Sequence, residues 1–324
     1  MKLLITGGSG FIGTHLIEFL LMNNAAVEIL NIDSQESLIL DGRLKTFIFD
    51  IRGEDLKSIS LKENFDACIH LAALCKEPGY NWEEYFETNH IGTVNTIRLC
   101  EELGIESIIF TSTMMVYKAG EMQRTENSIT APDTAYGISK LLAEKELEAW
   151  RDRKPGRSLK VIRPAVVFGA NENGNFTRLY HTLNRGLFPY IGKRSTVKSN
   201  IYVKELVMFM EYLLEHKTKS DIFNFSFPIK YSIGRIVGYF KSVFGLKPLT
   251  PVLPYKLMLF VAYWFEFLNV IGLKNSVHHR RIQKLYYSTD IYPENAMKEG
   301  YKFKYDLESA LEDWKEDCGS QGLY

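Results

Sequence analysis

Residues 2–13 read KLLITGGSGFIG, and this stretch decides the fold. The apolar run from Lys2 to Thr6 has the length and composition of a buried strand. From Phe11 to Met22, apolar residues recur at intervals of three and four, which indicates a helix. Three glycines, at positions 7, 10 and 13, lie between the strand and the first turn of the helix. The stretch therefore predicts a strand, a tight turn and a helix in direct succession.

The three glycines have different expected roles. Gly7 permits the tight turn, Gly10 lets the backbone approach a ligand that a Cβ would obstruct, and Gly13 lets the helix pack closely on the strand. The helix begins at Phe11 and Ile12, where unpaired N–H groups attract anions. The spacing GxxGxxG differs from the GxGxxG dinucleotide fingerprint. Its place between a strand and a helix nevertheless predicts that these five residues hold the pyrophosphate of a dinucleotide.

The strand–helix pattern continues through the first half of the chain. Further apolar runs predict strands, and amphipathic stretches predict helices between them. The expected strands are residues 27–32, 46–49, 67–71, 107–110 and 159–163, and the longer helices are residues 82–103 and 134–153. Apolar strands that alternate with helices indicate a parallel sheet covered on both faces. We therefore expect an α/β fold with a doubly wound parallel sheet of the Rossmann type.

The pattern changes after Arg163. Residues 169–192 contain interspersed Gly, Asn and Pro, which predicts a loop, whereas residues 201–215 have helical spacing. The remaining sequence mixes short strands and helices. We expect a dinucleotide-binding domain of residues 1–166 with a returning segment at about 196–226. Residues 167–195 and 227–324 then form a smaller, C-terminal, mixed α/β lobe that binds the substrate.

Composition excludes several classes of protein. The 324 residues include 39 Lys plus Arg and 39 Asp plus Glu, so the net charge is zero, which disfavours a nucleic-acid binder. With 46% hydrophobic and 24% charged residues, the chain is typical of a folded globular protein. Its four cysteines form no CxxC pair and have no zinc-site spacing. We therefore expect free thiols, no metal site and a cytoplasmic location.

One apolar segment needs separate interpretation. Residues 257–273 read LMLFVAYWFEFLNVIGL, close to the roughly 18 apolar residues that suggest a membrane span. Glu266 and Asn269 interrupt the run, and both are costly in lipid. We therefore expect no transmembrane span but a buried or groove-lining helix. Contact with a membrane surface or a partner protein is the alternative.

Carboxylates at strand ends indicate which dinucleotide binds. Asp33 follows the second strand, 20 residues after Gly13, where a carboxylate accepts hydrogen bonds from the adenosine ribose. An Asp at this position repels a 2′-phosphate, and no Arg follows within nine residues. The sequence thus favours NAD over NADP. Asp50 and Ile51, which follow the third strand, are candidates for contact with the adenine.

A tyrosine and a lysine four residues apart are candidates for catalysis. Tyr136 and Lys140 lie on one face of the expected helix, where the ammonium group favours the phenolate and lowers the tyrosine pKa. Tyr136 could then act as a general base near neutral pH. Residues 111–113, Thr-Ser-Thr, end the fifth strand at the same edge of the sheet. One of these hydroxyl groups could bind the substrate oxygen, and spacing alone does not select which one.

At this point the sequence resembles the extended short-chain dehydrogenase/reductase superfamily, in its NAD-dependent nucleotide-sugar epimerase/dehydratase branch. The motifs that carry the resemblance appear in family order over about 160 residues. They are TGGSGFIG at 6–13, Asp33, Asp50-Ile51-Arg52, His70-Leu71-Ala72-Ala73, Asn89, Gly92-Thr93, FTSTMMVY at 110–117, Glu126 with Pro132, YGISK at 136–140 and Ile162-Arg163-Pro164. Beyond residue 165 the likeness is looser.

The resemblance implies roles for individual residues. Tyr136 matches the catalytic base, Lys140 its partner at the nicotinamide ribose, and Thr113 the catalytic hydroxyl residue. Leu71, Ala72 and Ala73 match a backbone stretch that follows the cofactor. Two further matches concern structure and substrate: Asn89 matches a position that braces the sheet, and Asn175 one that contacts the sugar nucleotide. Lys118 departs from the family pattern, which usually has Gly at this position of the substrate mouth.

The same resemblance narrows the reaction. The family's dehydratases carry Asp-Glu directly after the catalytic Thr, whereas here Met114 and Met115 cannot transfer protons. A 4-epimerase acting through a transient 4-keto sugar needs only the residues already named, and it is the preferred prediction. A 4-keto-sugar-nucleotide reductase is the main alternative, and Arg185-Gly186 is similar to a feature of such reductases. Other dehydrogenases and a non-catalytic dinucleotide sensor are weaker alternatives.

His70 is expected to be a packed histidine rather than a proton carrier.

Contacts with the substrate and with other protein chains are the least determined by sequence. The basic run 278–281 predicts a solvated helix face, and a contact from Arg280 or Arg281 to the substrate diphosphate is the alternative. The resemblance implies a possible homodimer through the helices at 82–103 and 134–153.

Overall fold

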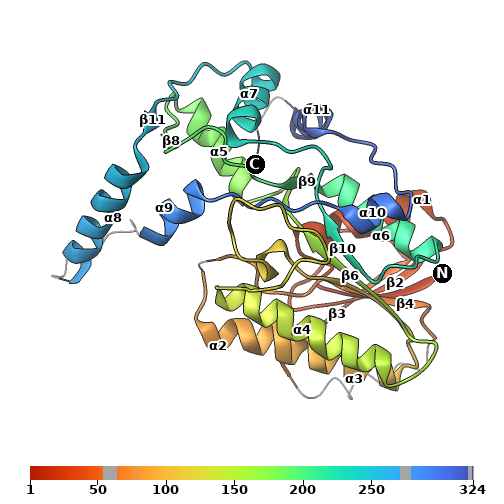
Figure 1. The fold of residues 1–324 in the computed structure, drawn as a ribbon. Coiled ribbons are helices and arrows are strands. Elements are labelled where there is room, and N and C mark those ends of the chain that lie inside the picture. The colour runs from red at the N-terminus through yellow and green to blue at the C-terminus, as the bar shows by residue number, and fades with distance from the viewer. Residues whose placement is uncertain (54–63, 78, 271–278, 320–322, 324) are drawn as a thin grey trace.

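A seven-stranded parallel sheet forms the centre of the protein in the computed structural model, which describes residues 1–53, 64–77, 79–270, 279–319 and 323 (Figure 1). Its strand order is β10-β6-β5-β4-β1-β2-β3. The strands are β1 (Lys2–Thr6), β2 (Glu28–Asp33), β3 (Leu44–Ile48), β4 (Ala67–His70), β5 (Ser107–Thr111), β6 (Ser158–Pro164) and β10 (Ile222–Phe225). The order reverses at β1, as in a doubly wound fold, so the predicted fold class is confirmed.

Helices cover both faces of the sheet (Figure 1). On one face α1 (Phe11–Asn23) packs against α6 (Val203–Glu215), and on the other α3 (Gly92–Glu102) packs against α4 (Ala135–Asp152). Successive residues of a strand point to opposite faces. Leu3 and Ile5 of β1 accordingly belong to one apolar core, and Leu4 belongs to the other. This two-sided burial explains why the strands are apolar throughout.

The long helix predicted over residues 82–103 is helical throughout but interrupted. It consists of α2 (Trp82–Tyr85), a π-helical segment (Phe86–Ile91) and α3. A π-helical segment widens the helix locally and is often found at functional sites. Here it contains Asn89, whose side chain is fully buried.

Between residues 165 and 215, one prediction is wrong and the start of another is shifted by two residues. Residues 169–192 are not a loop, since they contain α5 (Asn175–Asn184) and β8 (Tyr190–Ile191). Phe176 and Leu183 of α5 are buried at helical spacing, but the flanking Gly and Asn residues obscured this pattern. The helix predicted from residue 201 begins only at Val203, because the three residues before it form β9 (Asn200–Tyr202), which pairs with β7 (Val166–Phe168).

The C-terminal region adds two small layers beside the sheet. In one, α7 (Ile233–Phe244) packs against α11 (Leu307–Cys318), and β8 pairs with β11 (Val252–Leu253). In the other, α10 (Glu294–Lys298) packs on β10. Helices α8 (Tyr255–Val270) and α9 (His279–Tyr286) contact each other and form an arm that projects from the body (Figure 1). None of the described helices combines the length and apolar content needed to cross a bilayer.

The apolar segment 257–273 is helical up to residue 270, and residues 271–273 lie outside the described part of the chain. The prediction that this helix is buried is wrong for one face. Ala262 is buried, but Leu257, Phe260, Tyr263 and Trp264 are exposed. Helical periodicity identifies an apolar helix and does not tell what covers each of its faces.

Candidate active site

The glycine turn between β1 and α1 is too crowded for side chains at three of its positions, one of which is Gly8, where a Cβ would lie 2.4 Å from the side-chain oxygen of Asn31. Gly7 has a φ of 79°, and a Cβ there would lie 2.5 Å from the backbone nitrogen of Ala72. A Cβ on Gly13 would lie 2.4 Å from the carbonyl oxygen of Gly7. Gly10 differs, because its Cβ would meet only the Gly7 oxygen, at 3.4 Å, and would otherwise enter open space. The turn therefore packs closely on its inner side and leaves its outer side accessible.

The accessible side of the turn suits a pyrophosphate. Helix α1 begins at Phe11 and Ile12 with no side-chain cap at Gly10 and no acidic residue in its first turn. Its first N–H groups can therefore donate to an anion, and the helix dipole favours negative charge there. The residues present fit the diphosphate of a dinucleotide, with these N–H groups as donors and Gly10 as the point of closest approach.

Asp33 lies beside this turn at the end of β2. Its carboxylate accepts hydrogen bonds from the backbone N–H groups of Ser9, at 2.9 Å, and Gln35, at 3.1 Å. Asn31, two residues earlier in β2 and fully buried, accepts from the N–H of Gly8 at 2.9 Å. The strand thus fixes the turn through two polar side chains. The sequence pattern identified Asp33, which ends the strand. It did not identify Asn31, a polar residue inside an otherwise apolar strand.

Replacement of Asp33 by Ala is expected to weaken NAD binding by about 1–3 kcal/mol, or roughly five- to 150-fold in Kd, because charged hydrogen bonds to the adenosine ribose are lost. Titration calorimetry of the purified protein with NAD measures the change. Glu28→Ala is the matched control, since Glu28 is an exposed carboxylate at the opposite end of the same strand, paired with Lys2 at 3.0 Å. Equal affinities of the two variants would contradict the ribose assignment.

The predicted adenine contacts are differently placed. Asp50 forms an ion pair with Arg52, with 2.5 Å between Oδ2 and Nη2, and the Arg52 hydrogen bonds lower the pKa of Asp50. Ile51 is buried, and its carbonyl accepts from the side chain of Asn95 at 2.9 Å. Ile51 is therefore a buried packing residue. The carboxylate of Asp50 already pairs with the guanidinium of Arg52.

The segment from Leu71 to Ala73 follows β4 and passes over the glycine turn. The N–H of Leu71 donates to the carbonyl of Thr6 at 2.9 Å, and Ala72 is the residue that a Cβ on Gly7 would strike. Asn89 holds the continuation of this segment, because its side chain accepts from the N–H of Leu74 at 2.8 Å and donates to the Leu74 carbonyl at 3.1 Å. Asn89 also donates to Ser139 at 3.0 Å and so connects the segment to α4.

The three hydroxyl residues after β5 have different surroundings. Ser112 donates to the buried carboxylate of Glu144, and the hydroxyl of Thr111 has no hydrogen-bond partner among the described residues. Thr113 accepts from the N–H of Met115 at 3.1 Å and lies close enough to the phenol of Tyr136 to lower its pKa. The geometry therefore supports Thr113, among the three, as the hydroxyl that acts with Tyr136.

Tyr136 and Lys140 lie at the start of α4. Thr134 caps this helix by accepting from the N–H of Gly137 at 3.1 Å. A Cβ on Gly137 would lie 2.3 Å from the carbonyl oxygen of Met115, so the first turn of α4 rests directly on the segment that follows Thr113. This close packing brings Tyr136 and Thr113 together. Gly137 is a positioning residue, and its only sequence signal is its place within YGISK.

Burial controls both pKa values in this pair. It raises the pKa of Tyr136 well above its usual range, with a smaller contribution from the thiol of Cys75. It also lowers the pKa of Lys140 to about 7, and Cys75 and Glu144 partly oppose this effect. The amine of Lys140 lies 4.1 Å from the ring centre of Phe110, and the largest influence on Tyr136 is desolvation rather than a neighbouring charge. The prediction that the lysine lowers the tyrosine pKa is therefore wrong for this structure, because desolvation dominates.

The lowered pKa of Lys140 makes the free energy of unfolding depend on pH. An unfolded Lys titrates near 10.4, so between about pH 7 and 10 the unfolded chain binds the proton that the folded protein has lost. Compared with Lys140→Met, the wild-type protein without added cofactor is expected to gain stability as the pH rises through this range. Urea unfolding of both proteins at pH 7 and 9 measures the difference. A constant difference would contradict the lowered pKa.

His70 is a packed residue, as the sequence predicts. It is fully buried, its Nδ1 lies 2.6 Å from Thr6 Oγ1, and its Nε2 lies 2.9 Å from Thr93 Oγ1. Burial, together with the charge of Lys140, lowers the pKa of His70 to about 3. The ring is therefore neutral and braces β4 against β1 and the helix that follows.

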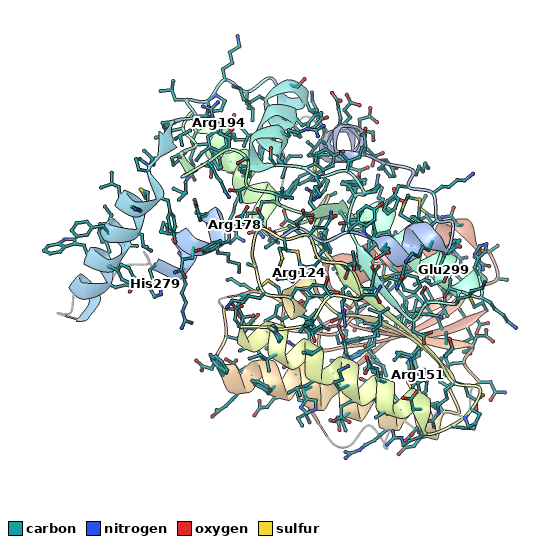
Figure 2. All side chains as sticks on the ribbon, viewed as in Figure 1. Arg124, Arg151, Arg178, Arg194, His279 and Glu299 are labelled. Atoms are coloured by element: carbon teal, nitrogen blue, oxygen red, sulfur yellow. The ribbon has the colours of Figure 1, made fainter. Side chains whose placement is uncertain are left out.

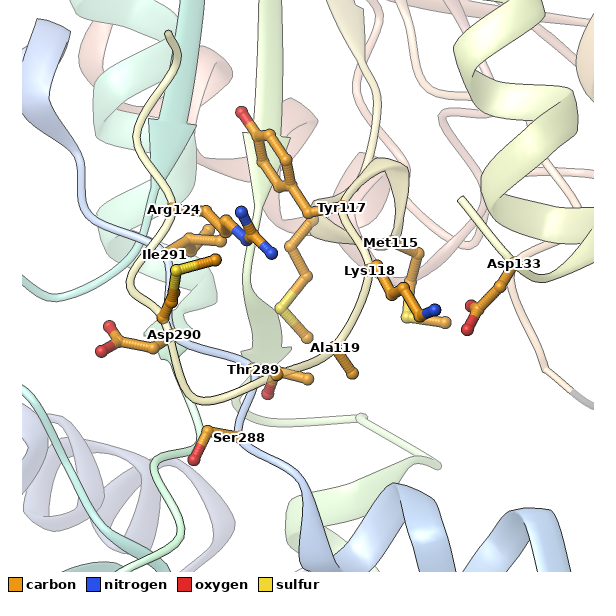
Figure 3. Close-up of a pocket in the computed structure, with 13 residues that line it drawn as sticks. Met115, Tyr117, Lys118, Ala119, Arg124, Asp133, Ser288, Thr289, Asp290 and Ile291 are labelled. Atoms are coloured by element: carbon orange, nitrogen blue, oxygen red, sulfur yellow. The ribbon is translucent and has the colours of Figure 1, made fainter. Parts of the chain in front are cut away.

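A pocket lies between the loop that follows Thr113 after β5 and the segment before α10 (Figure 3). Met115, Lys118 and Asp133 line one side, and Ser288 to Ile291 line the other. The thioether of Met114 also borders it, so this wall offers no acid or base where the dehydratases carry one. Lys118 and Asp133 point toward each other across the rim (Figure 3).

The two predicted substrate residues lie away from this pocket. Asn175 is the exposed first residue of α5 and accepts from Arg178 at 3.2 Å, and Arg280 is exposed on α9. Two other cations also influence this region: burial lowers the pKa of Lys284 on α9, Glu77 and Asp133 oppose this effect, and the charge of Arg178 on α5 adds to it. Figure 2 shows Arg178 between the arm and the body. Lys284 and Arg178 were missed because they are 106 positions apart in the sequence and share no motif.

A buried ion pair connects the helix that carries Tyr136 to the central sheet. Arg163 of β6 and Glu144 of α4 are almost fully buried, with Nη2–Oε2 and Nε–Oε1 distances of 2.6 and 3.0 Å. Arg163 also donates to the hydroxyl of Tyr117 at 2.7 Å, which in turn donates to Asn224 of β10 at 2.9 Å. The network connects α4, and therefore Tyr136, to two strands of the sheet.

Together, the fold and the site define a dinucleotide-dependent oxidoreductase with a Tyr–Lys pair at the edge of a doubly wound sheet. The model of the NAD dependent epimerase/dehydratase family matches residues 3–226. The chain belongs to this family, so the predicted resemblance, the enzyme class and NAD as the cofactor are confirmed.

Two curated relatives differ in how much of the chain they match. An Escherichia coli O157:H7 protein, N-acetyl-alpha-D-glucosaminyl-diphospho-ditrans,octacis-undecaprenol 4-epimerase, is 30% identical over 314 residues, which is 96% of this chain and 93% of that protein. The UDP-glucose 4-epimerase of Neisseria meningitidis serogroup B is 31% identical over 204 residues, which is 59% of this chain and 60% of that protein.

Solved structures show the same fold. The UDP-glucose 4-epimerase of Thermotoga maritima, solved with UDP-glucose, has a TM-score of 0.76 at 21% identity and covers 98% of both chains. The UDP-glucuronic acid 4-epimerase of Bacillus cereus, solved with NAD, has a TM-score of 0.75 at 20% identity, covering 98% of this chain and 99% of that one. At these identities the likeness concerns the fold alone.

Proposed function

We propose that this protein is an NAD-dependent 4-epimerase of a sugar that carries a diphosphate. The observation that carries the proposal is the juxtaposition of Tyr136 and Thr113 at the edge of the sheet, next to a pocket wall in which Met114 and Met115 offer no further acid or base. Oxidation and return of hydride at one carbon requires a single group that takes up and gives back a proton. Tyr136 can supply both steps.

The protein side chains have distinct roles in this proposal. In its phenolate form, Tyr136 takes the proton from the C4 hydroxyl group of the sugar and becomes the neutral phenol, and the hydroxyl of Thr113 hydrogen-bonds the same sugar oxygen. Bound NAD supplies a nicotinamide that accepts the hydride from C4 and gives it back. The 4-keto sugar then presents its other face, and Tyr136 returns the proton to the oxygen. Because burial raises the pKa of Tyr136, proton uptake by the phenolate is strongly favoured once that anion forms.

A nucleotide-activated sugar is the first substrate class that we propose, as for the UDP-glucose epimerases among the relatives. A sugar attached through diphosphate to a polyprenol is the second. One observation favours the second class: the alignment with the Escherichia coli relative spans 96% of the chain and so includes nearly all of the C-terminal region. The Neisseria meningitidis alignment leaves about two fifths of the chain unmatched.

The test combines product analysis with the cofactor balance. The purified protein is incubated with UDP-glucose, UDP-N-acetylglucosamine and N-acetylglucosaminyl-diphospho-polyprenol, and the sugars are separated after hydrolysis. An epimerase forms the C4 epimer with no net change in nicotinamide absorbance. Stoichiometric loss of added NADH with a 4-keto sugar would identify a reductase instead, and NAD binding without turnover of any of these sugars would favour a sensor.

Three further predictions belong with this proposal. The division into a dinucleotide domain and a substrate lobe is supported by β10, which returns to the sheet from residues 222–225. A homodimer through the helical stretch 82–103 and α4 is supported by one exposed apolar side chain on each, Ile91 and Leu142. A cytoplasmic location is supported by the free state of all four cysteines. Sedimentation velocity of the purified protein tests the dimer.

A further inference from the structure

Helix α8 exposes a face of large apolar side chains. The exposed fractions are 54% for Leu257, 69% for Phe260, 50% for Tyr263 and 56% for Trp264. Leu257, Phe260 and Trp264 follow one another at intervals of three and four, so they lie along one side of the helix. Four large apolar residues grouped on one short helix differ from the scattered single residues that are normal on a protein surface.

The opposite side of α8 already makes the contacts that hold the arm together. Ala262 is fully buried with Ile191 of β8 and Ile282 of α9, and Tyr255 and Met258 pack against the same cluster. Apolar side chains on both sides of a helix indicate that both sides are covered in the working protein. Among the described residues, the buried contacts of α8 lie on its inner side.

The charges of α8 and α9 indicate what kind of surface binds the exposed apolar face of α8. Lys256 on α8 and Arg280 and Arg281 on α9 are exposed cations. Among the described residues of these two helices the only acid is Glu266, which lies 2.7 Å from His279 Nδ1. An apolar face with Trp, Tyr and Phe beside several cations is the composition of helices that lie in the headgroup region of an anionic bilayer. A second copy of this chain would bring the same cations together.

The length of α8 decides whether the helix can cross a bilayer. Sixteen residues rise about 24 Å, which is less than the roughly 30 Å of a hydrocarbon core. The helix also carries Lys256 and Glu266. It therefore lies in the plane of the interface rather than across it.

Helix α9 connects this face to the active site. At one end, His279 stacks on Tyr263 of α8 with 5.0 Å between ring centres. Five residues further, or about 7.5 Å along the axis, the amine of Lys284 donates to the carbonyl of Glu77 at 3.3 Å. Glu77 follows the segment that passes over the cofactor turn, and the same Lys284 is near Arg178. Helix α9 therefore reaches from the exposed apolar face to a cation, Lys284, of the kind that binds a diphosphate.

We propose that α8 docks the enzyme on an anionic phospholipid bilayer, with Leu257, Phe260 and Trp264 in the interface and Lys256, Arg280 and Arg281 at the lipid phosphates. Docking places the mouth of the active site at the membrane surface, where a sugar diphosphate attached to a polyprenol is presented. The identity of this substrate rests on the proposed function. The docking itself rests on the arm alone.

The test is flotation of the full-length protein with vesicles. Wild-type protein is expected to float with vesicles of phosphatidylglycerol and phosphatidylcholine in equal parts and only weakly with phosphatidylcholine alone. Leu257→Ser/Phe260→Ser is expected to reduce the partition coefficient at least about tenfold, because two apolar contacts with lipid are lost. Lys256→Glu is expected to reduce it at least about fivefold, and only with the anionic vesicles. Met22→Ser/Leu249→Ser is the matched control, since both side chains are exposed elsewhere on the body.

Each outcome has a defined meaning. If wild-type protein does not float, or if the α8 double variant floats as well as the control, docking is refuted. If sedimentation velocity instead shows that the double variant turns a dimer into a monomer, the face is a subunit contact and docking is also refuted. An affinity for NAD, measured by calorimetry, that is unchanged in the double variant shows that the variant is folded. Flotation without turnover of any sugar leaves docking standing and refutes the proposed function.

Discussion

Replacement of Tyr136 by Phe is expected to reduce turnover by about 10²- to 10⁴-fold, the usual effect of losing a general acid–base group. The phenol is the group positioned to take up and return the C4 proton, and Phe keeps its ring in place. The affinity for NAD is expected to stay near that of the wild type, because the pyrophosphate and ribose contacts lie at the glycine turn and Asp33. Turnover is measured as formation of the C4 epimer, and NAD affinity by calorimetry.

Tyr80→Phe is the matched control for this experiment. Tyr80 is a half-exposed tyrosine that contacts Tyr85, which in turn contacts Tyr136, but it lies outside the catalytic pair. Its removal is expected to leave turnover within a few-fold of wild type. A Tyr136→Phe enzyme with wild-type turnover would exclude the phenol from the mechanism, whatever the sugar.

The second large effect is structural. Glu144→Leu is expected to lower the free energy of unfolding by about 3–5 kcal/mol, because the guanidinium of Arg163 stays buried without its carboxylate partner. The hydroxyl of Ser112 loses its acceptor as well. Urea unfolding measures the loss.

Two companion variants separate this effect from a general sensitivity of α4. Glu148→Leu removes a carboxylate one turn further along the same helix, where the pair with Lys145 lies at the surface, and is expected to cost at most about 1 kcal/mol. Glu144→Leu/Arg163→Met removes both buried charges and is expected to recover most of the lost stability. A double variant as unstable as Glu144→Leu alone would show that side-chain packing, not the unpaired charge, sets the cost.

The elements that the sequence predicted are those specified by local patterns. Strand β1, the glycine turn and α1 follow from twelve consecutive residues, and Tyr136 with Lys140 follows from one helical turn. Thr113 could be selected only in three dimensions, because Ser112 is engaged by Glu144 of another element. The periodicity of the sequence likewise does not show that Glu144 is the buried partner of Arg163.

The wrong predictions have a common physical cause. Helix α5 was hidden by Gly and Asn residues that flank it, although its own buried residues are periodic. The pKa of Tyr136 depends on burial, which a sequence does not report, and burial outweighs the nearby lysine. The exposed side of α8 depends on whether another part of the chain returns to cover it, and propensity carries no information about that.

The contact between Gly137 and the Met115 carbonyl restricts how this enzyme can be engineered. A β-carbon at residue 137 would force α4 away from the loop after β5 and would separate Tyr136 from Thr113. Libraries that aim to change the accepted sugar can therefore vary Met114 and Lys118 along the pocket wall. They should leave residue 137 as glycine, since every replacement there alters the catalytic distance before it alters selectivity.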